Sequence, residues 1–446
     1  MQKLISAVEK NKQLIFDAES YIWKNPETGY KEVKTSNYLA QKFTELGYEL
    51  NLADGITGFY TTLDTGKPGP TLLILGELDS IICPTHPESN TQTGAVHSCG
   101  HHAQCAALLG VAAALKEPNA LDGLSGKIKL CAVPAEELLE IEYRNELMAK
   151  GVIKYYGGKP EFLSRGYFDD VDLAFMVHTT NNQNFSVRSG SVGCIAKKIT
   201  YKGLAAHAGG SPWLGKNAIY AATCGLNACN ALRETFKEDD IIRFHPIITH
   251  GGDMVNAIPE TATIESYVRG KTFDAIKNAN KRINQALCGA ALSLDNNVEI
   301  LDKAGYAPLI NDLNMIELAR DALSLAFPEE EFSYTPGFGS GSTDMGDLSA
   351  IMPVIHPYAP GATGKGHGND YFVTDKEKAC VGSAKWQVTM IYLLLKDGAQ
   401  RAKKIVSEFK PLFKNKEEYF EFIETLECKG DRIDYSDDEK SVTVKL

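Results

Sequence analysis

The sequence predicts an α/β protein with a mostly parallel sheet, into which a smaller α+β domain of ferredoxin-like order is inserted. Strand-like and helix-like segments alternate from the start, with an apolar run at 71–75, a small-residue helix at 103–115, and strand-like runs at 127–133 and 172–177. Such alternation is typical of βαβ units, which build parallel sheets. After residue 190 the predicted order becomes β-α-β-β-α-β, which is the ferredoxin-like arrangement.

The predicted inserted domain covers residues 190–306. Its elements are a strand at 194–201, a helix at 217–233, strands at 241–248 and 261–268, a helix at 274–293 and a strand at 298–301. A helix at 313–325, a Gly-rich loop at 337–341 and the apolar run 351–356 then return the chain to the first sheet. The first domain is therefore predicted in two pieces, 1–189 and 307–446. Two domains also suit a chain longer than the roughly 250–300 residues at which single cores stop growing.

Composition narrows the function classes. Lys plus Arg number 46 against 57 for Asp plus Glu, a net charge of −11, which argues against nucleic acid as a main partner. The segment 1–16 reads as an amphipathic helix, and no run of about 18 apolar residues appears, so we expect a cytoplasmic protein without a membrane partner. The ten cysteines include no CxxC pair and are expected to be buried thiols or metal ligands. From about residue 400 we expect one or two charged surface helices, with 434–446 partly disordered.

Chemically active side chains cluster at the ends of predicted strands and in two glycine-containing loops. They are Cys99 and His101 in a Cys-Gly-His loop, Glu136 and Glu137 just past one strand, His178 at the end of another, and His367 in GKGHGNDYF. In open α/β sheets, ligands bind outside the carboxyl ends of the strands. Thiolate, imidazole and carboxylate are the usual ligands of zinc. Each residue alone is better explained as an ordinary buried or surface side chain, but together they predict a metal site.

The adjacent carboxylates of Glu136 and Glu137 suit two different roles. Neighbouring side chains of an extended chain point to opposite sides, so one carboxylate can bind metal while the other faces a water molecule. A carboxylate placed beside a metal-activated water can take its proton and later pass it to a leaving amine. The pair therefore predicts hydrolytic chemistry.

Several longer motifs extend this pattern along nearly the whole chain. They are NPETGYKEVKTSNYL (25–39), GELDS (76–80), HSCGHH (97–102), VPAEE (133–137), VH (177–178) and GLAAHAGGSPWLGKNAIYAA (203–222). With the late His367, these motifs resemble the amidohydrolase branch of the aminoacylase and glutamate-carboxypeptidase superfamily of two-metal hydrolases. The segments PWLGKNA and GSTDMGDLS are similar to sequences of the subgroup that contains aminobenzoyl-glutamate hydrolase and aminoacylase-1-like protein 2.

The resemblance implies a zinc-peptidase-like catalytic domain with an inserted lid and dimerisation domain. It implies two divalent ions per subunit, zinc or manganese first, with cobalt and nickel open to the same ligand types. One ligand would bridge the ions, and the implied ligands are Cys99, His101, Glu137, His178 and His367. Glu136 would be the general base.

The resemblance also assigns residues of the inserted domain. His207 would reach into the partner subunit's site and stabilise the oxyanion, which implies a homodimer or a higher homo-oligomer. Asn256 and Arg269 would hold the substrate carboxylate, because the planar fork of Arg binds both oxygens. As an alternative, Arg269 is a plain surface charge at the end of a strand.

Some histidines and one aspartate depart from the family pattern. His102 stands where Asp or Asn often follows the Cys-Gly-His, which leaves the exact ligand set open. His97 is expected to orient the loop, and Asp79 to support the site without binding metal. Structural roles are expected for His86, His245, His250 and His356.

The predicted function is that of a metal-dependent amidohydrolase or peptidase that cleaves N-acyl or N-aroyl amino acids, or small dipeptides, bearing a free carboxylate. A metal-bound hydroxide would attack the carbonyl while Glu136 moves the proton. One alternative is a strict dipeptidase or aminopeptidase, which requires a free substrate amine. Another is a catalytically inactive metal-binding scaffold, although Glu136 and all five ligand positions are intact.

Overall fold

The computed structural model describes residues 1–437 and 440–446, which form two compact units. The first unit contains Met1–Gly190, Leu309–Gly337 and Thr343–Lys416. The second contains Ser191–Pro308, Phe338–Ser342 and Glu417–Leu446. The prediction that 307–446 belongs entirely to the first domain is therefore wrong, because the chain returns to the second unit twice.

The main sheet of the first unit is mostly parallel, as predicted. Its strand order is β1 (Asn51–Leu52), β2 (Phe59–Asp64), β6 (Lys127–Val133), β3 (Thr71–Glu77), β7 (Leu173–Phe175) and β17 (Val354–Ile355). β3 pairs in parallel with β6 and β7, β17 pairs in parallel with β7, and β1 and β2 form an antiparallel edge. Every residue of β3 is buried, which explains why this strand reads as a continuous apolar run.

Helices pack around this sheet. They include α1 (Gln2–Lys10), α2 (Lys12–Trp23), α3 (Val33–Glu45), α4 (His101–Leu115), α9 (Leu313–Ala326) and α11 (Ser383–Glu408), the last broken at Lys396–Ala399. All residues of α4 are buried, and its many alanines let it pack closely against α2, α11 and β3. A helix that is apolar on all sides is a core helix, and this one begins at His101.

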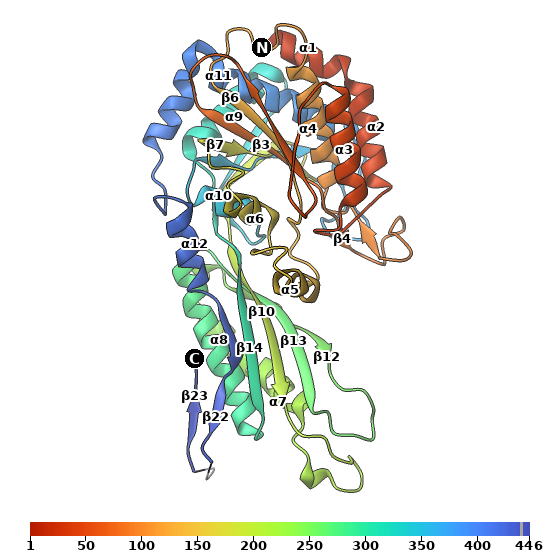
Figure 1. The fold of residues 1–446 in the computed structure, drawn as a ribbon, viewed down its shortest axis with the longest axis vertical. Helices are drawn as coiled ribbons and strands as arrows, with labels where there is room; N and C mark the ends of the chain where they lie inside the picture. Colours follow the sequence, from red (N-terminus) through yellow and green to blue (C-terminus); the bar gives the residue numbers. More distant parts are fainter. Residues whose placement is uncertain (438–439) are drawn as a thin grey trace. The chain divides into compact units, whose positions relative to one another are not determined.

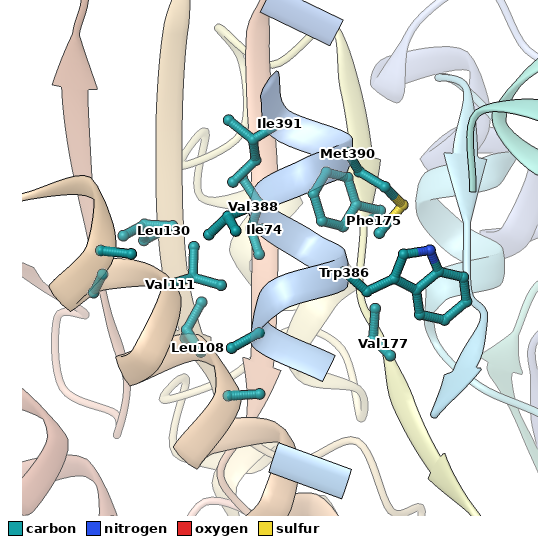
Figure 2. Close-up of a cluster of buried hydrophobic side chains, with 14 of the residues drawn as sticks. Ile74, Leu108, Val111, Leu130, Phe175, Val177, Trp386, Val388, Met390 and Ile391 are labelled. Carbon is teal, nitrogen blue, oxygen red and sulfur yellow. The ribbon is translucent and has the colours of Figure 1, made fainter. Parts of the chain in front are cut away.

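One hydrophobic core joins these layers (Figure 2). Side chains from the sheet, from α4 and from α11 point toward one another in this close-up. The labelled residues are Ile74, Leu108, Val111, Leu130, Phe175, Val177, Trp386, Val388, Met390 and Ile391. These side chains come from distant parts of the chain, so their packing holds the strands and α4 together. It thereby fixes the strand ends that carry the predicted ligands.

A second, smaller sheet of the first unit carries His178. Its order is β15 (Leu309–Ile310), β9 (Phe185–Ser191), β18 (Tyr358–Pro360) and β8 (His178–Thr180), and β16 (Phe332–Gly339) pairs with β9. β8 and β18 run parallel, with His178 opposite Tyr358. The predicted Gly-rich loop is thus partly strand. The remaining elements of this unit include α5 (Ile141–Ala149), α6 (Gly158–Ser164), α10 (Met345–Ser349), β4 (Ile81–Ile82), β5 (Ala95–Val96), β19 (Ala362–Thr363) and β20 (Phe372–Val373).

The second unit has the predicted ferredoxin-like order. β10 (Gly193–Lys202) is central and antiparallel to both β13 (Thr261–Gly270) and β14 (Asn297–Tyr306). α7 (Ala218–Ala231) and α8 (Phe273–Ser293) pack on each other and on these strands (Figure 1). The predicted strand 241–248 is in fact two, β11 (Arg243–Phe244) and β12 (Ile247–His250), because Pro246 between them has no N–H to donate.

The C-terminal segment completes the second unit. After α12 (Lys416–Glu424), β21 (Cys428–Asp431) pairs with β14 and extends its sheet. β22 (Ile433–Tyr435) and β23 (Val442–Val444) then form a hairpin where partial disorder was predicted. Residues 438–439 of that prediction lie outside the described residues. Within the described ranges, no helix combines the length and apolar character needed to cross a bilayer.

Candidate metal centre

The Cys-Gly-His loop is shaped by the start of α4. Gly100 caps this helix in the left-handed conformation, with φ of 93°. A Cβ at this position would lie 2.4 Å from the Tyr371 hydroxyl and 3.0 Å from Thr179, so only glycine fits. Cys99 and His101 therefore flank a sharp turn at Gly100, one just before the start of α4 and the other at its first residue.

Two groups of potential metal ligands share Cys99. The first is Cys99, His101 and His178, and the second is Cys99, Glu137 and His367. In each group the ligand atoms lie within 4.8 Å of one another. The structure thus brings the ligand atoms of all five predicted ligands together, and Cys99 is the residue that would be shared if each group held an ion.

The imidazoles are held in the orientation that metal binding needs. The Nδ1 of His101 donates to the Asp79 carbonyl at 2.9 Å, and the Nδ1 of His178 donates to the Thr179 carbonyl at 2.7 Å. Each neutral ring then keeps the lone pair of Nε2 for a metal. The Nε2 of His101 is buried and has no hydrogen-bond partner among the described residues, and that of His178 lies 3.4 Å from Cys99 Sγ. These donors fit a divalent ion.

The Cys99 thiol is poised to ionise. Burial and the Glu137 carboxylate oppose its ionisation, but in the metal-free protein His101 and His178, in their protonated forms, outweigh them and lower the pKa of the thiol to about 6. A thiolate at neutral pH is the form that binds metal.

Glu136 and Glu137 face different histidines. Oε1 of Glu137 lies 3.0 Å from His367 Nε2, while Oε2 of Glu136 lies 3.8 Å from His101 Nε2. Burial, together with the neighbouring Glu77 and Glu137 carboxylates, raises the pKa of Glu136 well above its usual value. A carboxyl group with a raised pKa, next to the ligands, suits proton transfer.

The turn before these two glutamates is strained, and the side-chain carboxylate of Glu32, from the N-terminal part of the chain, holds it in place. Ala135 has φ of +55°, a left-handed conformation that non-glycine residues rarely adopt. Its N–H donates to Glu32 Oε1 at 2.8 Å, and Glu32 is completely buried. The N–H of Glu137 donates to Asp79 Oδ2 at 2.8 Å, so Asp79 holds the backbone of this turn. Glu32 belongs to the motif at 25–39, whose role the sequence did not reveal.

Three buried charged residues behind the site escaped the sequence analysis. Lys159 lies between Glu77 and Asp344, with its Nζ 2.5 Å from Glu77 Oε1 and also bonded to Asp344 Oδ1. Glu77 in turn lies 3.2 Å from His101 Nε2. Glu77, His101 and Glu136 form a third potential ligand group, but Glu77 is already neutralised by Lys159. The sequence signals were the place of Glu77 at the end of a buried strand and the presence of Glu77 and Asp344 in the motifs GELDS and GSTDMGDLS.

The remaining histidines take varied positions. His86 uses both ring nitrogens in hydrogen bonds, to Tyr371 and Glu88, which agrees with a structural role. His102 is buried, lies 3.5 Å from Glu19 and belongs to none of the ligand groups. The rings of His97 and His102 lie 5.5 Å apart. His356, expected to be structural, packs its ring 5.6 Å from that of His178, directly behind the ligands.

In the second unit, His207 and Asn256 come together, but Arg269 does not join them. The segment around His207 pairs with Ala257, and the N–H of Ala208 donates to the Asn256 carbonyl. Nδ1 of His207 accepts from the N–H of Gly210 at 2.9 Å, so a neutral ring carries its proton on the exposed Nε2. Arg269 lies near the far end of β13, roughly 25 Å along the strand from the end near Asn256.

Residues 74–391 match Peptidase family M20/M25/M40. The chain belongs to this family. The family-level resemblance and the fold class predicted from the sequence are therefore confirmed. All five candidate ligands, from Cys99 to His367, fall inside the matched range.

Two curated relatives show the level of sequence similarity within this family. The chain is 28% identical to a chain of p-aminobenzoyl-glutamate hydrolase from Escherichia coli over 316 residues, which are 68% of this chain and 61% of that protein. It is 30% identical to human Xaa-Arg dipeptidase over 282 residues, 61% of this chain and 58% of that protein. The chain thus spans about three fifths of the length of these relatives.

Solved structures share the fold over most of the chain. A Staphylococcus aureus protein described as an aminohydrolase has a TM-score of 0.70 at 23% identity and covers 89% of this chain and all of its own. A dinuclear metal-binding peptidase from Bacillus subtilis has a TM-score of 0.64 at 17% identity, covering 87% of this chain and 99% of its own.

Proposed function

We propose that the protein is a two-metal amidohydrolase that cleaves N-acyl or N-aroyl amino acids, or small dipeptides, with a free carboxylate. The observation that carries the proposal is the pair of ligand groups that share Cys99, with Glu136 beside them. The names of the curated relatives, a p-aminobenzoyl-glutamate hydrolase and a dipeptidase, support an amide bond next to an amino acid as the target.

The chain supplies binding, orientation and proton transfer. Divalent ions, when bound, would polarise the amide carbonyl and lower the pKa of a water molecule. Glu136 takes a proton from the attacking water and delivers it to the leaving nitrogen, for which its raised pKa is suited. Asp79 and the strained Ala135 hold the backbone of this turn, so both glutamates keep their directions.

His207 would act in the site of a partner subunit. Its Nε2 is exposed and, in the neutral ring, carries the proton that an oxyanion needs. Because Asn256 and Arg269 lie near opposite ends of β13, one copy cannot use both on one small substrate. A homodimer resolves this conflict, since each site would take Asn256 and His207 from one copy and Arg269 from the other.

Exposed apolar side chains on the second unit support such a dimer. Trp213 is 76% exposed, Ile247 63% and Val255 fully exposed. Ile247 lies on β12, which pairs only with β13 among the described strands and leaves an open sheet edge. Large exposed apolar groups beside an unpaired edge are typical of protein interfaces.

The first test is release of free amino acid from a panel of N-acyl amino acids, aminobenzoyl-glutamate and dipeptides, with chelator or with added zinc or manganese. Chelator-sensitive release is expected. The Glu136→Gln variant should bind metal and keep its fold but lose turnover, so full turnover in that variant would remove Glu136 as the base. No release from folded, metal-loaded protein would favour the alternative of an inactive scaffold.

A complementation experiment tests the shared site. Glu136→Gln and His207→Ala subunits, each inactive alone, are co-expressed so that mixed dimers form. Random pairing places one competent site in half of the dimers, so about a quarter of wild-type activity should return. Activity no higher than that of the separate variants would show that His207 does not act across subunits.

The second candidate is a strict dipeptidase, which the similarity to Xaa-Arg dipeptidase favours. The two candidates differ in the substrate amine. A dipeptidase cleaves unblocked dipeptides and rejects the N-acetylated forms, whereas an amidohydrolase accepts the acylated forms.

A further inference from the structure

A polar cavity of about 490 Å³ opens in the first unit beside the small sheet that carries His178. Most of its lining residues carry hydroxyl or amide groups, including Thr180, Asn182, Ser186 and Tyr358. Its single charged lining residue is Arg188, and no carboxylate lines it. The volume falls within the range of ordinary small-molecule sites.

Arg188 is a solvent-exposed residue of β9 that lines this cavity. Within residues 1–437 and 440–446, no ion pair of Arg188 is found, although the chain carries a net charge of −11. Glu331 does not line the cavity, and it accepts a hydrogen bond at 3.2 Å from Asn184, which does. A guanidinium in a polar cavity that no carboxylate lines gives the cavity a local preference for anions.

Tyr358 connects this cavity to the metal centre. It lines the cavity, and its ring lies 5.4 Å from the ring of His178, which it faces across paired strands. Thr180, two residues after His178, lines the same wall.

We propose that this cavity is a substrate subsite in which Arg188 binds a carboxylate of the molecule being cleaved. A carboxylate of an amino acid lies on the order of 3–5 Å from its amide nitrogen, whether it is the α-carboxylate or that of an Asp or Glu side chain. The cavity wall lies at a similar distance from the candidate ligands, because the ring centroid of the lining residue Tyr358 is 5.4 Å from that of His178. The inference rests on the proposed hydrolase function and adds the substrate group that the first unit itself recognises.

The experiment measures kcat and KM for N-benzoyl-alanine, N-benzoyl-aspartate, N-benzoyl-glutamate and N-benzoyl-alaninamide in wild type and three variants. In Arg188→Met, KM for carboxylate substrates should rise about tenfold or more, because a charge-assisted hydrogen bond is lost, while kcat changes little. Arg188→Lys should restore part of the affinity. Arg320→Met, which removes an exposed guanidinium paired with Glu317, is the matched control and should leave KM unchanged.

The substrates separate the two sources of the carboxylate. A rise in KM for all three acids, but not for the alaninamide, assigns Arg188 to the α-carboxylate. A rise confined to the aspartate and glutamate substrates assigns it to the side chain. Equal effects on acids and amide, or none, would overturn the proposal.

Binding gives a readout that does not depend on turnover. Calorimetric titration of N-benzoyl-glutamate into the metal-loaded Glu136→Gln protein, with and without Arg188→Met, should show weaker binding in the double variant. Unchanged affinity would refute the subsite. Failure of the proposed function looks different, because wild-type protein would then release no amino acid from any substrate.

Discussion

Replacing Lys159 by methionine should destabilise the protein strongly while keeping the shape of the side chain. Lys159 is completely buried, and its ammonium is bonded to both Glu77 and Asp344, which are also buried. Lys159→Met leaves these two carboxylates without their cation. Removing one partner of a buried ion pair costs about 3–5 kcal/mol, because the remaining charge is neither solvated nor paired. That loss is a large share of the roughly 5–15 kcal/mol by which folded proteins are stable.

Urea unfolding of metal-free protein, followed by fluorescence, measures this loss. The matched control is Lys129→Met, since Lys129 is also buried but pairs with Asp170, whose side chain is 52% exposed. Water can solvate Asp170 when the lysine is gone, so the control should lose clearly less stability. Adding Asp344→Asn to Lys159→Met removes one stranded charge and should recover at least about 1 kcal/mol.

Two results would refute this reasoning. Equal losses in Lys159→Met and Lys129→Met would show that lost packing, and not the stranded carboxylates, sets the cost. A double variant no more stable than Lys159→Met alone would show that Asp344 does not depend on the lysine charge.

Three further outcomes are expected. Glu32→Ala should lose about 1–3 kcal/mol of folding stability and much of kcat, because the N–H of Ala135 loses its buried acceptor. Glu32→Gln keeps an acceptor oxygen and should retain both the stability and kcat. Equal kcat in the two variants would exclude a positioning role. The rate of Cys99 alkylation in metal-free protein, followed by mass spectrometry, should be half-maximal near pH 6, because the lowered pKa leaves the thiol ionised at higher pH. A midpoint near pH 9 would contradict the lowered pKa. Trp386→Phe should lose about 1–3 kcal/mol in urea unfolding, because the buried Ala319 carbonyl loses its donor; a loss below about 0.5 kcal/mol, on the order of a surface substitution, would disprove this.

The candidate site residues could be predicted because each stands in a local pattern. Cys99 and His101 flank the glycine at a helix start, and Glu136 and Glu137 follow a buried strand. Parallel strands end at one edge of a sheet, so residues just past these ends had to meet. Hydrophobic periodicity indicated the strands and helices themselves, including most of the second unit.

Other features depended on contacts across the chain. The C-terminal strand β21 joins β14 because the edge of that sheet offered unpaired backbone groups, which no local pattern in 428–431 reveals. In the same way, the sequence suggests that Arg269 and Asn256 could hold the same substrate carboxylate. Only the run of β13 between them shows that they lie far apart within one copy.

The sequence by itself therefore determined the fold class, the family and the five candidate ligands, because periodicity and short motifs encode them locally. The tertiary structure alone decided that Lys159 is a buried counter-ion for Glu77 and Asp344, which are 82 and 185 residues away from it. A lone lysine in a sequence reads as a surface residue, since burial of its charge is favourable only where folding brings carboxylates to it.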